Sequence, residues 1–108
     1  MVVEIDDINT IKKGNVLVDF YTSTCGPCKA LNPILEEIST EFKDLRVAKV
    51  EVTRNPAASQ VFGVMSVPTL MFIQDSHVKE VARGFSNKAN IMSMVRKHLR
   101  NGNGKKGK

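Results

Sequence analysis

Apolar residues follow two patterns along the chain, a short continuous run and a helical spacing, and each pattern predicts a type of secondary structure. A nearly continuous apolar run over residues 16–21, interrupted only by Asp19, predicts a buried central strand. Apolar residues at helical spacing predict an amphipathic helix over residues 28–42 and another over residues 87–100. Pro33 lies inside the first of these helices, where it removes a hydrogen bond, and we expect a kink there.

The remaining elements are shorter. We expect strands over 2–5, 45–52, 69–73 and 77–82, and short helices over 6–13 and 56–62. The last two strands surround a turn without glycine and form a hairpin. The resulting order, β-α-β-α-β-α-β-β-α, predicts an α/β fold with a central mixed β-sheet flanked by helices. The sheet should be parallel in its first part and end in an antiparallel pair.

The length of 108 residues suits a single domain, which we place at residues 1–100. Residues 101–108 contain only Asn, Gly and Lys and predict a disordered basic tail. The net charge is +5, and three lysines of this tail supply three of those charges, which leaves +2 for residues 1–104. A C-terminal patch for nucleic acid or acidic partners is the weaker interpretation, because no aromatic residue is interleaved for base stacking.

The chain shows no apolar run long enough for a membrane helix, and its N-terminus lacks the basic region of a secretory signal. We therefore expect a cytoplasmic protein. We also expect it to be a monomer. In that compartment thiols stay reduced, so two cysteines are poor candidates for a structural cross-link. They are better explained by chemistry.

The two cysteines, Cys25 and Cys28, follow the buried strand and open a helix, as a dithiol that gains and loses two electrons requires. The helix N-terminus favours an anion at Cys25, so we predict that Cys25 attacks a disulfide and Cys28 resolves the product. Gly26 permits a tight turn, and Pro27 stiffens the first helical turn without losing a needed hydrogen bond.

Asp19 is the second candidate for chemistry. A carboxyl group in a buried strand should have a raised pKa, because burial penalises its charged form. Such a group can take the proton of Cys28 and return it. The alternative is a structural ion pair with a lysine such as Lys49, and the two roles are compatible.

A metal site is not expected, because zinc would need two further ligands and the histidines have no paired spacing. His98 should complement the dipole at a helix end, and His77 should be a surface turn residue. Met92 and Met94 are typical of core packing. For Met65, lining a substrate groove and packing are left as equal alternatives.

Several motifs in the same order resemble the thioredoxin family. Residues 18–29, with Cys-Gly-Pro-Cys and the upstream aspartate, are similar to its active-site stretch. Residues 47–50 with 55–56 are similar to its third strand and following helix, residues 66–69 to its cis-proline loop, and Gly84 to a glycine beside its active site. The resemblance implies a thioredoxin fold and a protein-disulfide reductase that carries electrons in its own disulfide, with no bound cofactor.

The resemblance also implies roles and partners. Lys49 would tune Asp19, and a cis peptide at Pro68 would present the backbone of Val67 to a substrate strand. The partners would be proteins with disulfides and a thioredoxin reductase or another dithiol donor. The residues expected to face substrate are Thr24, Gly26, Pro27, Val67, Pro68, Arg83 and Gly84.

Three residues depart from the family pattern: Thr24 and Tyr21 replace tryptophans, and Arg83 replaces an apolar residue. They predict altered partners, including poor service by the usual thioredoxin reductase. A disulfide isomerase or oxidant, and a non-catalytic interaction module with this fold, are the alternative functions. The intact dithiol with Asp19 argues against the module, and the Gly-Pro dipeptide favours a reductant.

Overall fold

A computed structural model describes residues 1–104, with side chains described for residues 1–100. Its elements are β1 (Val2–Glu4), a 3₁₀ helix η1 (Ile8–Ile11), β2 (Asn15–Tyr21), α1 (Gly26–Glu41), β3 (Leu45–Glu51), α2 (Pro56–Val61), β4 (Thr69–Gln74), β5 (His77–Arg83) and α3 (Lys88–Gly104). The five strands form one sheet in the order β1-β3-β2-β4-β5. The predicted α/β architecture is confirmed, with β1, β3 and β2 parallel and β4 antiparallel to both of its neighbours.

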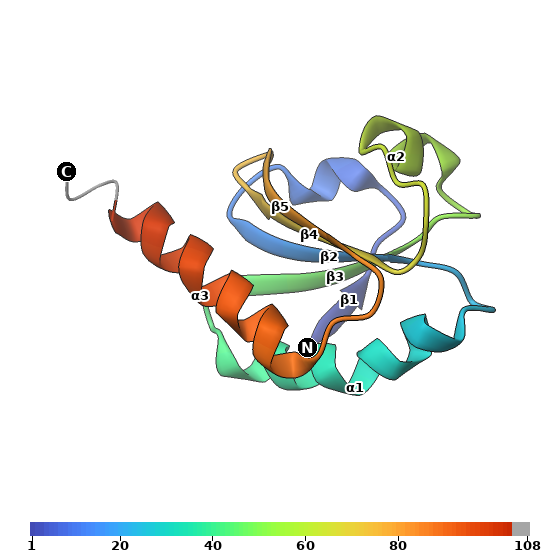
Figure 1. The fold of residues 1–108 in the computed structure, drawn as a ribbon. Helices are drawn as coiled ribbons and strands as arrows, with labels where there is room; N and C mark the ends of the chain where they lie inside the picture. Colours follow the sequence, from blue (N-terminus) through green and yellow to red (C-terminus); the bar gives the residue numbers. More distant parts are fainter. Residues whose placement is uncertain (105–108) are drawn as a thin grey trace.

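Helices cover both faces of the sheet (Figure 1). On one face, Leu31, Leu35 and Ile38 of α1 and Ile91 and Val95 of α3 pack on a fully buried core. On the other face, Ile8 and Ile11 of η1 and Ala58 of α2 pack in a second cluster of apolar side chains. Because side chains of a strand alternate between faces, Asp19 of β2 lies on the face that α1 and α3 cover.

Two expected elements differ in detail. The first helix is a single 3₁₀ turn, because its apolar residues are too few to hold α-helical turns against the sheet, and Asp7 caps it through the amide of Asn9. The last helix continues to Gly104 and not only to Arg100. The rest of the predicted tail, residues 105–108, lies outside the described part of the chain.

The β4–β5 hairpin forms without glycine, as predicted, because Asp75 and Ser76 both adopt positive φ angles of 50° and 74°. The carboxylate of Asp75 accepts a hydrogen bond of 2.8 Å from the amide of Gly14, which ties this turn to the start of β2. Asp tolerates this backbone conformation better than most residues. Among the described helices, none combines the length and apolar character needed to cross a membrane.

Candidate active site

The dithiol lies where β2 ends and α1 begins. Cys25 is the N-cap of α1, and its sulfur accepts a hydrogen bond of 3.2 Å from the amide of Cys28. The two cysteines form a disulfide with Cα atoms 5.2 Å apart. Cys25 is partly exposed, whereas Cys28 is only 2% exposed. An accessible sulfur at a helix N-terminus and a buried one behind it are the arrangement that stepwise thiol–disulfide exchange needs.

The cis-proline loop and Thr22, three residues before Cys25, line one pocket. The Val67–Pro68 peptide bond is cis, as the resemblance implied. Gly84 has a φ of 86°, and its amide donates a hydrogen bond of 2.8 Å to the carbonyl of Pro68. That contact joins the loop to the end of β5, where Arg83 is exposed. Pro68 is itself buried and Val67 partly buried.

The rim of the site is largely exposed. Thr24, Gly26 and Pro27 are all open to solvent. Met65 is 92% exposed and borders a shallow pocket of about 250 Å³ with Val67 and Val52. The interpretation of Met65 as a packing residue is therefore wrong, because a side chain this exposed makes few contacts with the rest of the protein. By contrast, Met94 is buried and Met92 packs against the core, as predicted.

Asp19 is completely buried, and within the described chain neither of its carboxyl oxygens has a hydrogen-bond partner. Burial raises the pKa of Asp19 from its ordinary 3.8 to about 7, and the charge of Glu4 adds to the rise while that of Lys49 opposes it. The residue therefore has the raised pKa that its position in the sequence predicted. A carboxyl group whose pKa is near neutral pH can exchange a proton at physiological pH.

The structural ion pair considered for Asp19 is absent among the described residues. Lys49 stands next to Asp19 across the parallel β2–β3 register. Its ammonium donates instead to Oδ1 of Asn32, at 2.7 Å, and lies 4.2 Å from the centre of the Tyr21 ring. Lys49, Asn32 and Tyr21 line a pocket of about 140 Å³ together with Cys28. The pocket gives Lys49 a polar environment beside Cys28.

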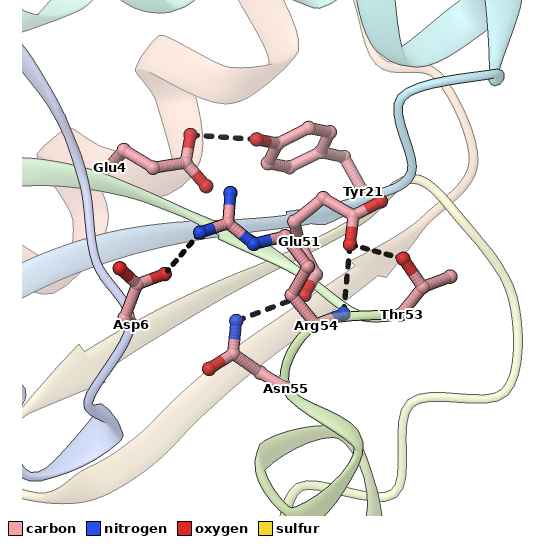
Figure 2. A network of polar contacts seen from close by, with 7 residues as sticks. All are labelled: Glu4, Asp6, Tyr21, Glu51, Thr53, Arg54 and Asn55. Atoms are coloured by element: carbon pink, nitrogen blue, oxygen red, sulfur yellow. Dashed lines mark hydrogen bonds and ion pairs between the residues drawn. The ribbon is translucent and has the colours of Figure 1, made fainter.

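The loop before Cys25 is held by an acid that the sequence reasoning missed. Glu51, at the end of β3, is buried, and its carboxylate accepts hydrogen bonds from the amide of Ser23 at 3.2 Å and of Arg54 at 3.0 Å. The hydroxyl of Thr53 donates to it as well (Figure 2). These bonds, the Thr53 contact first, lower the pKa of Glu51. The sequence held one indication of this role. Glu51 lies two residues after Lys49, so strand alternation places both side chains on the same face of β3.

The same region links β1 to the active-site strand. The hydroxyl of Tyr21 donates a hydrogen bond of 2.7 Å to the carboxylate of Glu4 (Figure 2). The guanidinium of Arg54 lies 3.7 Å from Oδ1 of Asp6, just after β1. Burial and the bond to Glu4 raise the pKa of Tyr21, which therefore stays a neutral donor. Tyr21 thus connects Glu4 on one side with Lys49 on the other.

Removing the Glu51 carboxylate should loosen the turn that carries Cys25. In Glu51→Ala, we expect the amide of Ser23 to lose protection from hydrogen exchange, because its acceptor is gone. The amide of Val52, which donates to the carbonyl of Tyr21 at 2.9 Å, is the internal control and should stay protected. Unchanged protection at Ser23 would show that Glu51 does not hold the turn.

The two histidines lie away from the dithiol. His98 is not at a helix end, because α3 continues beyond it. Its Nε2 contacts Glu80 at 2.7 Å, and its ring stacks on Phe72. His77 is exposed, as predicted, but it is the first residue of β5 and not part of the turn itself. Within residues 1–104, no group of three or more His, Cys, Asp or Glu side chains is arranged to hold a metal ion.

Comparisons with known proteins agree with this geometry. The thioredoxin family model matches residues 5–97. The chain is 42% identical to a thioredoxin from Bacillus subtilis (strain 168) over 88 residues, which cover 81% of this chain and 85% of that protein. It is 36% identical to a thioredoxin from Chlamydia muridarum, with 83% and 88% covered. A mutant thioredoxin from Halobacterium salinarum NRC-1 superimposes with a TM-score of 0.84 at 28% identity, over 89% of this chain and 88% of that one.

The residues matched by the family model include β2, the dithiol turn and α1. Thioredoxins carry their electrons in a disulfide without a bound cofactor. The Cys25–Cys28 disulfide supplies that redox group here. The chain belongs to the thioredoxin family and is a thiol–disulfide oxidoreductase.

Proposed function

We propose that this protein is a cytoplasmic carrier of electrons that reduces disulfides in other proteins. The observation that carries the proposal is the asymmetry of the dithiol, with a partly exposed Cys25 at a helix N-terminus and a buried Cys28 behind it. In the reduced protein, the Cys25 thiolate attacks one sulfur of the substrate disulfide. A mixed disulfide forms, and the other substrate sulfur leaves as a thiolate.

In the second step, Cys28 passes its proton to Asp19, and its thiolate attacks the Cys25 sulfur of the mixed disulfide. The bond to the substrate breaks, the second substrate thiolate leaves, and both thiolates take up protons. The substrate gains two electrons and the dithiol becomes the Cys25–Cys28 disulfide. The proton role of Asp19 is supported by its burial and its pKa of about 7, and Lys49 tunes it.

The substrate strand is proposed to pair with the backbone of Val67 beside the cis-proline. The contact surface around it is proposed to consist of Thr24, Gly26, Pro27, Arg83 and Gly84, while the buried Pro68 fixes the backbone of Val67 through its cis peptide bond. We further infer that the protein works as a monomer and that a thioredoxin reductase or another dithiol donor returns the two electrons.

The direct test is reduction of insulin disulfides with dithiothreitol as donor. We expect the protein to accelerate precipitation of the insulin B chain in proportion to its concentration. Equilibration with a glutathione buffer then distinguishes a reductant from an isomerase or oxidant, because a reductant stays oxidised until the buffer is strongly reducing. No acceleration of insulin reduction would contradict the proposed function.

The rim predicts poor recognition by a general thioredoxin reductase. Thr24 offers little apolar area beside the nucleophile, and Arg83 adds a charge at the rim. We expect turnover with such a reductase to be well below that of a typical thioredoxin, and Thr24→Trp to raise it because a large apolar contact is restored. The measurement is NADPH consumption at varied protein concentration. Turnover equal to that of a typical thioredoxin would refute altered recognition.

A further inference from the structure

The least expected contact in the site is the one between Lys49 and Asn32. Lys49 faces Asp19 across neighbouring parallel strands, and Asp19 has no hydrogen-bond partner among the described residues. An ammonium and a buried carboxylate in this register would normally attract each other. Nevertheless, the Lys49 ammonium donates to the neutral oxygen of Asn32, at 2.7 Å.

Two features hold Lys49 in this position. The side-chain amide of Asn32 comes from α1, one helical turn after Cys28 and on the same face. The Tyr21 ring supplies a second contact, with the ammonium 4.2 Å from its centre, and the Tyr21 hydroxyl is itself fixed by Glu4. A cation over an aromatic ring and beside an amide oxygen needs no carboxylate partner.

We propose that Asn32 is a positioning residue that holds the Lys49 ammonium away from Asp19 and thereby keeps the Asp19 carboxyl able to carry a proton. The inference rests on the proposed proton role of Asp19. If Lys49 were free to turn toward Asp19, its charge would stabilise the carboxylate and make that group a poor proton acceptor at neutral pH.

Other groups that can titrate lie near Asp19 as well. Glu4 of β1 acts on it with a negative charge, and Tyr21 lies two residues along the same strand. Cys28 of α1 lines the same pocket as Lys49 but does not titrate while it is in the disulfide. On the other side, β4 places the apolar Leu70 opposite Asp19. Lys49 is therefore the cation whose position decides how strongly the carboxylate is favoured.

The test is a ¹³C NMR titration of the Asp19 carboxyl group in the oxidised protein. In Asn32→Ala, we expect its pKa to fall by about 1, because Lys49 loses its acceptor and turns to Asp19. In Asn32→Asp, we expect the pKa to rise, because a carboxylate keeps Lys49 and adds a second negative charge. Asn90→Ala, an exposed position on α3, is the matched control and should leave the pKa unchanged.

A double variant separates positioning from a general change in the helix. In a Lys49→Met background, Asn32→Ala should no longer move the pKa of Asp19, since the cation that it positions is absent. An unchanged pKa in Asn32→Ala, a fall in Asn32→Asp, or an equal fall with and without Lys49 would each overturn the proposal.

The proton role of Asp19 is tested separately by the pH dependence of the second step, measured as release of substrate from the mixed disulfide. If that dependence follows the new pKa in Asn32→Ala, both the positioning and the proton transfer stand. If the pKa falls but the pH dependence does not move, Asn32 positions Lys49 and Asp19 is not the proton acceptor.

Discussion

Replacing Cys25 with serine is expected to abolish protein-disulfide reduction. A serine hydroxyl is not ionised at neutral pH and cannot attack a disulfide, so the insulin assay should fall to the rate of dithiothreitol alone, a loss of about 100-fold or more in the catalysed rate. The fold should survive, because Cys25 is partly exposed and serine is an equally good N-cap.

Cys28→Ser should lose turnover to a similar extent for a different reason. The first attack by Cys25 still occurs, but the mixed disulfide is no longer resolved, so the protein becomes trapped on its substrate. Thr24→Ser, next to the dithiol, is the control and should keep most of the activity. Full activity in Cys25→Ser would contradict the assignment of the nucleophile.

The second large effect concerns stability and pH. Asp19 is buried with a pKa of about 7 in the folded protein, whereas the unfolded chain releases the same proton near 3.8. The folded state therefore binds more protons than the unfolded state between these values. This contribution to stability is therefore fully present below about pH 4 and is lost as the pH rises through 7. The difference between the pKa of Asp19 in the folded and in the unfolded protein corresponds to a change of about 4 kcal/mol in the free energy of unfolding.

The measurement is chemical denaturation of the oxidised protein between pH 4 and pH 8, in wild type and in Asp19→Asn. Asparagine fills the same space but does not titrate, so the other groups cancel in the comparison. The stability of the variant relative to wild type should increase with pH, by up to about 4 kcal/mol across the range. A difference that stays constant with pH would mean that Asp19 titrates normally in the folded protein.

Much of the fold could be predicted because its signals are local. The run over residues 16–21 is apolar except for Asp19, as is typical of a strand buried on both faces, and Leu31, Leu35 and Ile38 recur at helical spacing. The short η1 turn was less predictable, since it depends on a single cap by Asp7 and on packing against the sheet. The end of α3 at Gly104 runs against the low helix propensity of its Asn and Gly residues.

Some residues of the candidate site could also be predicted from local sequence patterns, and others could not. Cys25, Cys28 and Asp19 are apparent from the sequence because their spacing and context suit one kind of chemistry. Asn32 and Glu51 act through contacts between elements that are distant in sequence, such as α1 with β3. Such contacts depend on rotamers and on strand register, which no local pattern specifies. For that reason the expected partner of Lys49 was Asp19, whereas the structure gives Asn32.

The central claim is that Cys25 attacks and Cys28 resolves. Mass spectrometry of intact protein after incubation with a disulfide-containing peptide, without reductant, tests it directly on reduced Cys28→Ser and Cys25→Ser. We predict a covalent adduct of one peptide thiol on Cys25 in Cys28→Ser and none in Cys25→Ser. An adduct that forms on Cys28 in Cys25→Ser, with Cys28→Ser unmodified, would contradict the assigned roles.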